Sequence, residues 1–198
     1  MIIIKNNKEI DLMRSAGRIV AETLLLVEEK VRPGITTAEI DRIAEEFITK
    51  HGAKPSFKGL YGFPASLCIS VNEQVVHGIP GGYVLKDGDI VSVDCGAYLN
   101  GFHGDAARTF AVGNVSEEAN KLIKVTEQSF FKGIEYAKVG NRLTDISHGI
   151  QSYIEASGFA VVRDFVGHGI GRVVHEDPDV PNFGKPGRGP KLAQGMAL

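Results

Sequence analysis

The chain has 198 residues, of which 43% are hydrophobic and 23% charged, as in an ordinary globular domain that can bury its own core. A formal net charge of −2 gives no electrostatic case for a nucleic-acid partner. No apolar run approaches the roughly 20 residues that span a bilayer, and the apolar start is too short for a signal peptide. Cys68 and Cys95 are too few for a disulfide framework. We therefore expect a cytoplasmic protein without a membrane partner.

The first two predicted elements are helices. Apolar residues at helical spacing predict a helix over residues 6–29, and Gly34 lies in the break that follows it. A second helix follows Thr36, whose spacing to Glu39 is that of a capping box. It ends near Gly52.

Three strands are predicted next. Residues 67–71 form a short apolar run, and residues 89–94 and 102–112 alternate in the manner of strands. Two helices followed by antiparallel strands indicate an α+β domain, with the helices on one side of a sheet.

The same order of elements then returns. A helix beginning at Ser116 is ended by Gly140, and another helix ends near Gly158. Subtracting 106 from five positions of this second pair gives matching residues of the first pair. This offset predicts an internal duplication, with halves of about 1–113 and 114–198, and chance similarity between two amphipathic helix pairs is the alternative. The matched residues are Gly140, Ile146, Tyr153, Ile154 and Gly158 with Gly34, Ile40, Phe47, Ile48 and Gly52.

Two carboxylates are predicted to lie on one face of a β-hairpin. Asn100-Gly101 is a strong two-residue turn signal, and with that turn Gly96 faces Asp105. Asp94 lies two positions from Gly96, so it shares a face with Asp105 at a diagonal distance of roughly 7–8 Å. Two such carboxylates can converge on one metal ion or on a pair of ions. The alternative is an Asp beside a turn and an exposed Asp paired with Arg108.

Three histidines stand in apolar, glycine-rich surroundings. His168 lies between two glycines, His175 follows two valines, and His77 precedes Gly78-Ile79-Pro80. A lone histidine is more often structural, but three in such settings favour a site. Oxygen ligands with one imidazole suit Mn, Fe(II), Co or Zn better than Mg or Ca. The sequence therefore predicts a metal centre with Asp94, Asp105 and His168 as ligands.

These motifs resemble a known family. Val75-Val76-His77-Gly78-Ile79-Pro80, Val93-Asp94-Cys95-Gly96 with Asp105, and Gly167-His168-Gly169-Ile170-Gly171 followed by His175-Glu176 are similar to those of type I methionine aminopeptidases. The likeness covers essentially the whole chain. It implies the pita-bread fold, in which two similar α+β halves of one metallopeptidase domain clasp a dinuclear metal site.

The resemblance also implies an activity and roles. In the family, metal-activated hydroxide releases the N-terminal methionine of nascent polypeptides. The positions of Asp94, Asp105 and His168 bind the two metals, that of His77 contacts the scissile amide, and that of His175 polarises the carbonyl. No cofactor besides the two divalent ions (Co, Mn, Fe or Zn) is implied.

The methionine side-chain pocket matches the family less completely. Phe63 and Cys68 match family positions, whereas Leu60 replaces a common Tyr, Phe57 a common Cys and Val174 a common Phe. An apolar pocket for an unbranched thioether is still expected.

The family carries two further ligands, both glutamates, beyond position 198, and one of them is also the general base. We therefore expect a C-terminally truncated chain that binds metal weakly and has little activity. We also expect a monomer for the full-length protein and self-association of this chain through an exposed strand edge. The alternatives are a short non-catalytic module that binds peptides or the ribosome, and a relative of the Xaa-Pro peptidases.

Overall fold

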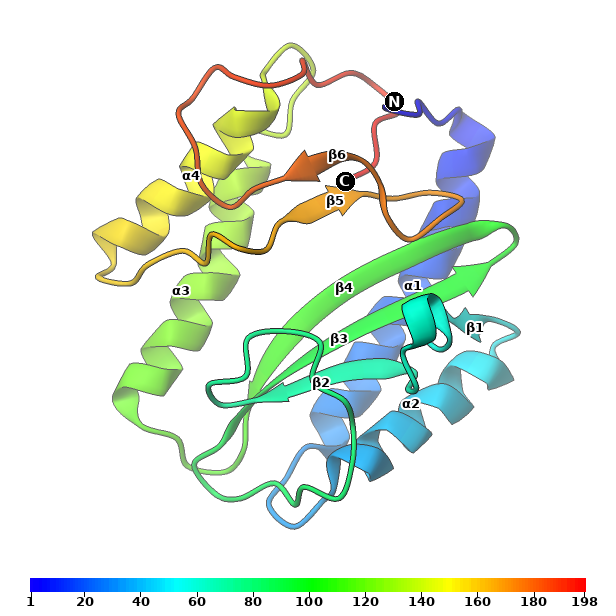
Figure 1. Ribbon diagram of the computed structural model, residues 1–198, viewed down its shortest axis with the longest axis vertical. Helices are drawn as coiled ribbons and strands as arrows, with labels where there is room; N and C mark the ends of the chain where they lie inside the picture. The colour runs from blue at the N-terminus through cyan, green and yellow to red at the C-terminus, as the bar shows by residue number, and fades with distance from the viewer. The chain divides into compact units, whose positions relative to one another are not determined.

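The computed structural model describes residues 1–198, which divide into two compact units (Figure 1). The first unit holds residues 8–119 and 171–174, and the second holds residues 1–7, 120–170 and 175–198. None of the helices combines the length and apolar character that crossing a membrane requires. The predicted halves of one domain, 1–113 and 114–198, stay a prediction.

The first unit begins with the two predicted helices, α1 (Asn7–Lys30) and α2 (Thr37–Lys50). Thr36 is the N-cap of α2, and its Oγ1 accepts a hydrogen bond from the backbone N–H of Glu39 at 3.1 Å. This satisfies one of the amides that a helix start leaves without an intrahelical partner. The predicted helix start at Thr36 is confirmed.

A four-stranded antiparallel sheet completes the first unit. It consists of β1 (Lys54–Pro55), β2 (Leu67–Val71), β3 (Ile90–Leu99) and β4 (Phe102–Ala111), with the short 3₁₀ turn η1 (Leu60–Gly62) before β2. Strand β3 pairs with β4 on one edge and with β2 and β1 on the other. The strand predicted to end at Asp94 continues to Leu99, because its pairing with β4 runs all the way to the turn.

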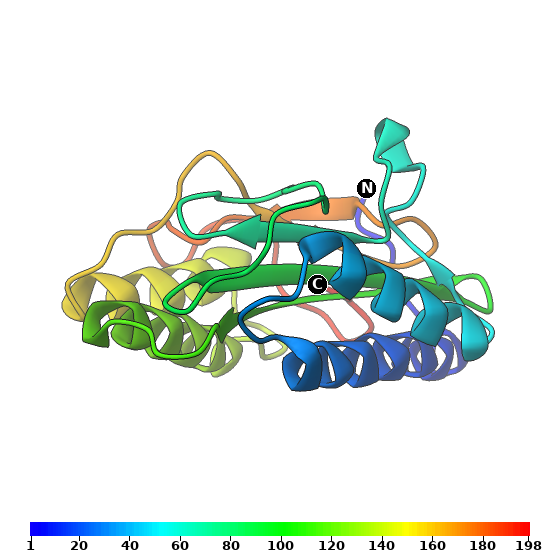
Figure 2. The same cartoon turned by 90° about the horizontal axis from the view of Figure 1, so that it is seen from below.

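The core of the first unit lies between its helices and this sheet, with α1 running along the sheet (Figure 2). Apolar residues of both helices, including Leu24 and Ile40, join Val91 and Val93 of β3 in one buried cluster. The helix backbone comes very close to β4. A Cβ added at Gly104 would lie 2.6 Å from the backbone nitrogen of Gly17, so only glycine fits there.

The second unit contains α3 (Glu117–Ile134), α4 (Leu143–Ala156) and the two-stranded sheet of β5 (Gly167–Gly169) and β6 (Glu176–Val180). The Oγ of Ser116 accepts a hydrogen bond from the amide of Ala119 at 3.1 Å, as expected for the predicted helix start. Helix α3 ends at Ile134, well before the predicted break at Gly140. It ends there because the amides of Tyr136 and Ala137 bond three residues back, in turns that leave the α-helical pattern.

The two units repeat each other at the offset that the sequence indicates. Helix α2 spans residues 37–50 and α4 spans residues 143–156, which is the same span moved by 106. The loop before each of these helices is joined to a later segment by a matched β-bridge and a matched backbone hydrogen bond. The pairs are Thr36–Val84 with Arg142–Lys191, and Gly34–Leu85 with Gly140–Leu192.

Candidate metal centre

The hairpin of β3 and β4 has the predicted turn and register. Asn100 and Gly101 both have positive φ, 53° and 89°, which is the backbone that a type I′ turn needs. Gly96 faces Asp105, and Asp94 faces Ala107. Because side chains alternate between the faces of a strand, Asp94 and Asp105 lie diagonally on the same face.

The two carboxyl groups are in contact. Burial raises the pKa of the Asp105 carboxyl, and a side-chain hydrogen bond with Asp94 lowers it in part. Two ionised carboxylates so close repel each other, so the pair is stable only when it shares a proton or holds a cation. Arg108, the cation of the alternative interpretation, pairs with Glu28 at 3.8 Å.

Cys68 lies directly across from Asp94 on β2, so the negative pair also borders a thiol. Burial, followed by the charges of Asp94 and Asp105, raises the pKa of the Cys68 thiol to about 12. At neutral pH Cys68 is therefore an uncharged, apolar side chain beside the carboxylates.

The five residues expected to bind a methionine side chain form one cluster in the first unit. Phe57, Cys68 and Val174 are buried there, and Leu60 and Phe63 pack against them. The cluster borders the carboxylate face at two points. Cys68 faces Asp94, and the ring of Phe57 lies on Gly96, where an added Cβ would be 2.8 Å from Phe57 Cε1.

His103 connects the hairpin to the segment 171–174, which carries Val174. The amide of His103 donates a hydrogen bond to the carbonyl of Gly171 at 2.8 Å. The Nδ1 atom of His103 lies 2.8 Å from Ser56 Oγ, and its ring packs against that of Tyr98, with centroids 4.7 Å apart and planes inclined by 44°. The sequence interpretation gave His103 no role. Its position two residues from Asp105, on the same strand face, was the signal that could have found it.

His77 lies in an exposed loop attached to β2. It has a positive φ of 59°, and the next residue, Gly78, is held against the strand. The carbonyl of Gly78 accepts a hydrogen bond from the amide of Ile69 at 2.8 Å, and a Cβ at Gly78 would lie 2.1 Å from Ile69 O. Because Ile69 adjoins Cys68, the loop that presents His77 is anchored next to the apolar cluster.

His168 and His175 lie together in the second unit. Their ring centroids are 4.5 Å apart and the rings are inclined by 68°. The Nδ1 atom of His168 lies 2.9 Å from the carbonyl oxygen of Gly169. Since a carbonyl only accepts, Nδ1 is the donor in this contact, and the contact fixes the orientation of the ring.

The donor chemistry fits a divalent metal ion. Asp94 and Asp105 offer carboxylate oxygens in contact, an arrangement that a bound cation stabilises, and His168 offers an imidazole nitrogen. In neither unit do three or more His, Cys, Asp or Glu side chains gather closely enough to hold an ion without further residues. The structure therefore brings together the carboxylate pair in one unit and the imidazole pair in the other.

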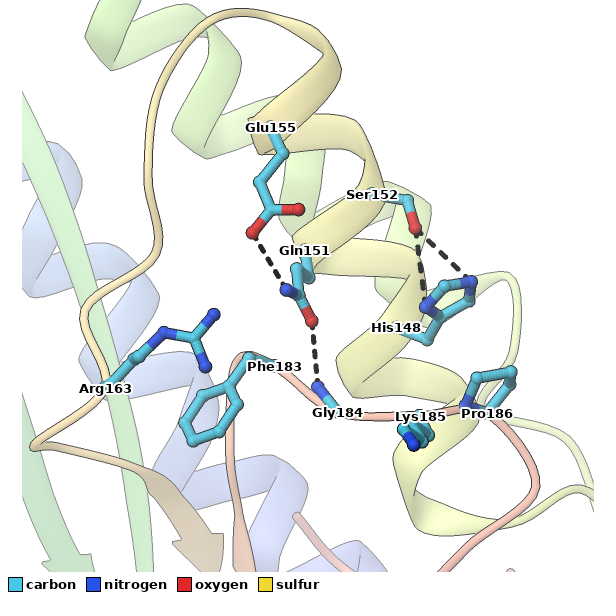
Figure 3. A pocket seen from close by; sticks show the side chains of 9 residues that line it. All are labelled: His148, Gln151, Ser152, Glu155, Arg163, Phe183, Gly184, Lys185 and Pro186. Atoms are coloured by element: carbon cyan, nitrogen blue, oxygen red, sulfur yellow. Dashed lines mark hydrogen bonds between the residues drawn. The ribbon is translucent and has the colours of Figure 1, made fainter.

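A separate hollow of about 420 Å³ lies in the second unit, between α4 and the segment around Gly184 (Figure 3). The guanidinium of Arg163 stands over the ring of Phe183 at 4.5 Å. Gln151 accepts a hydrogen bond from the amide of Gly184 at 2.9 Å and donates one to Glu155 at 2.8 Å. None of these residues belongs to the motifs that predict the metal centre.

Comparisons with known proteins agree with this geometry. The profile of metallopeptidase family M24 matches residues 11–198. A methionine aminopeptidase of Clostridium perfringens is 78% identical over the whole chain, which spans 80% of that protein's length.

Solved structures give the same result. A methionine aminopeptidase of Rickettsia prowazekii is 44% identical, with a TM-score of 0.97 over 99% of this chain and 79% of its own. The prolidase of Pyrococcus furiosus is 24% identical, with a TM-score of 0.85 over 98% of this chain and 55% of its own, and it supports the fold alone. These neighbours confirm the expected pita-bread fold. The chain belongs to metallopeptidase family M24 and, within it, to the methionine aminopeptidases.

Proposed function

We propose that this protein removes the N-terminal methionine of new polypeptides by metal-dependent hydrolysis, with Asp94, Asp105 and His168 as metal ligands. The observation that carries the proposal is the contact between the Asp94 and Asp105 carboxyls on one hairpin face. The apolar cluster beside them supports the choice of substrate, because an unbranched thioether packs well against aromatic and aliphatic side chains.

We further propose that the site holds two divalent ions, of Co, Mn, Fe or Zn. When bound, such ions polarise a carbonyl and lower the pKa of a water molecule, which is the chemistry that amide hydrolysis needs at neutral pH. Asp94 and Asp105 supply the negative charge that holds the ions. His168 supplies an imidazole nitrogen, and the contact between its Nδ1 and the carbonyl of Gly169 orients the ring.

The remaining residues act on the substrate. His77 and His175 are proposed as hydrogen-bonding residues at the scissile amide, His77 on the amide side and His175 on the carbonyl, where negative charge develops. The methionine side chain is proposed to lie against Phe57, Leu60, Phe63, Cys68 and Val174. Because the Cys68 thiol stays protonated, it adds no second charge near the substrate.

The substrate class suggests where the protein works. New polypeptides carry an N-terminal methionine as they leave the ribosome, so we propose a cytoplasmic enzyme that meets them there, with the ribosome itself as a second partner. A monomer is proposed for the full-length protein. No nucleic-acid contact is needed, in keeping with the net charge of −2.

Two other functions make different predictions. A non-catalytic module of the same fold would bind peptides that begin with methionine without needing metal. An Xaa-Pro peptidase would cleave substrates with proline in the second position. The 78% identity to a methionine aminopeptidase, against 24% to a prolidase, favours methionine removal.

The test combines calorimetry with peptide hydrolysis. Co²⁺ or Mn²⁺ is titrated into the metal-free full-length protein, and hydrolysis of Met-Gly-Met and Ala-Pro-Gly is followed with the metal present. Asp105→Asn should weaken metal binding more than about 100-fold, because changes one shell further from a metal already cost about 10- to 100-fold. The matched control is Asp11→Asn, an exposed Asp of α1, which should change neither reading.

Each alternative has its own outcome. Binding of Met-Gly-Met to metal-free protein, with equal affinity in Asp105→Asn, would indicate the non-catalytic module. Cleavage of Ala-Pro-Gly alone would indicate an Xaa-Pro peptidase. If the protein binds metal tightly and Asp105→Asn does not change the affinity, the proposed ligand set is wrong.

A further inference from the structure

The second unit contains a buried ion pair that the proposed reaction does not use. The ammonium of Lys5 contacts the carboxylate of Glu176, and each side chain is only 3% exposed. Lys5 Nζ also donates to the carbonyl of Ile3 at 3.0 Å. Removing two charges from water costs free energy that their attraction recovers only in good geometry, so a buried pair is weak evidence for stability. The position of the pair, next to the two histidines in sequence and strand register, says more about its role.

Glu176 adjoins one histidine of the unit in sequence and faces the neighbour of the other across the strand pair. It directly follows His175 in the chain, and across the β5–β6 ladder it pairs with Gly169, the neighbour of His168. A register shift separates His168 from Gly169, and a Cβ at Gly169 would lie 2.2 Å from the carbonyl oxygen of Asp177. The two short strands are therefore in close contact at Glu176, the residue whose carboxylate Lys5 contacts.

The N-terminal segment, residues 1–5, is bound to the rest of the unit at both of its ends. The amide of Lys5 donates to the carbonyl of Gly195 at 2.8 Å, and Gly195 has a φ of 88°. A Cβ at Gly195 would lie 2.4 Å from Lys5 O, so the two backbones are in close contact. At the start of the segment, the Met1 ammonium pairs with Asp177, the residue after Glu176.

We propose that Lys5 is a positioning residue: its ammonium holds Glu176 and thereby sets the orientation of the His168 and His175 rings. The proposal rests on the proposed function, in which these rings serve the metal and the substrate carbonyl. Lys5 precedes residues 11–198, the stretch that matches the family profile. It acts across 171 positions of sequence, from a segment that carries none of the motifs.

The test compares three variants, Lys5→Met, Glu176→Gln and the double variant. Each single variant leaves one buried charge without its partner and is expected to lose stability. The double variant removes both charges, so it should fold with a melting temperature close to that of the unaltered protein. Any change that the double variant shows in the two histidines therefore reports on positioning and not on a loss of stability.

Three quantities are measured on each variant, made in the full-length protein. The first is the set of imidazole ¹⁵N and ¹³C NMR shifts of His168 and His175 in metal-free protein, which requires no activity. The second is the affinity for Co²⁺, and the third is kcat and KM for Met-Gly-Met. In the double variant we expect shifted resonances for both imidazoles, about tenfold weaker Co²⁺ binding and a lower kcat at similar KM.

The matched control is Ile146→Val, a small core change in α4 of the same unit. It should lower the melting temperature slightly without moving the two imidazole resonances. A double variant that keeps both resonances and the Co²⁺ affinity of the unaltered protein would overturn the proposal. Failure of the proposed function would show differently: the unaltered protein would neither bind Co²⁺ nor cleave Met-Gly-Met, while the imidazole shifts would still report on Lys5.

Discussion

Each unit contains an equivalent pair of helices, held by equivalent β-bridges and backbone hydrogen bonds. The two units differ in the strands that carry the candidate site residues. The first unit places Asp94 and Asp105 on a long, regular hairpin whose ten residue pairs run without a bulge. The second unit places His168 on the short strand β5 and His175 directly before the short strand β6, and a register shift interrupts the pairing of these strands. The helix pairs are therefore the common scaffold, and the candidate site residues lie on or beside the strands, where the two units differ.

This difference shows how each kind of group is held in place. The β3–β4 hairpin packs directly against the backbone of α1 at Gly104, so the hairpin can move little. The positions of its two carboxylates are therefore set by the geometry of the strands. The short strands β5 and β6 have few ladder hydrogen bonds of their own. Their position depends on partners from distant sequence, among them Lys5.

The largest expected difference between the units concerns α1 and α3. Leu24 and Phe130 are matched by the offset of 106, but Leu24 is 2% exposed and Phe130 is 58% exposed. Leu24→Ala should lower the free energy of unfolding by about 2–5 kcal/mol, because it leaves a cavity, and Phe130→Ala by less than about 0.5 kcal/mol. Urea unfolding of both variants measures this. Equal losses would mean that the exposed face of α3 is covered in solution, and sedimentation at several concentrations would show whether a second copy covers it.

A smaller effect is expected where the hairpin meets α1. Gly104→Ala places a Cβ within 2.6–2.9 Å of the backbone of Ala16 and Gly17, and should cost about 1–3 kcal/mol of unfolding free energy. Gly17→Ala is the matched control, since nothing lies within 4 Å of its added Cβ. In a helix that exchange should be neutral or gain up to about 1 kcal/mol. Thermal unfolding that ranks the two variants the other way would contradict the close packing.

The smallest expected effect is on the pH dependence of the metal-free protein. The pKa of Asp105 is raised in the folded state, so its contribution to stability is complete below the unfolded carboxyl pKa, about 3.9, and is lost as pH rises through the folded value. Asp105→Asn should therefore flatten the stability curve above pH 4, whereas Asp11→Asn should not. Chemical unfolding at several pH values measures the slope, and a steeper fall in Asp105→Asn would refute the assignment.

Much of the first unit follows from local sequence signals. Thr36 caps α2 as predicted because the spacing to Glu39 specifies that geometry without any tertiary contact. The register of the hairpin follows from Asn100-Gly101, since a two-residue turn determines every pair behind it. The carboxylate face could therefore be placed from sequence alone.

The second unit was less predictable, for physical reasons. The short strands β5 and β6 contain Gly, Pro and Asp instead of an alternating apolar pattern, so no strand period marks them. The Lys5–Glu176 pair joins residues 171 positions apart, and only a charged side chain directly after three isoleucines hints at it. Contacts of this range depend on how the whole unit folds.

The turn at Asn100-Gly101 also bears on the chemical lifetime of the protein. Asn100 is exposed and is followed by glycine, the neighbour that least hinders attack of the backbone nitrogen on a side-chain amide. Deamidation through the resulting succinimide would leave an isoaspartate, which adds a methylene carbon to the backbone of the turn. Because the turn sets the pairing of Gly96 with Asp105, such ageing would shift one carboxylate relative to the other. Peptide mapping of stored protein, compared with its metal affinity, would show whether deamidation at the turn weakens the carboxylate pair of Asp94 and Asp105.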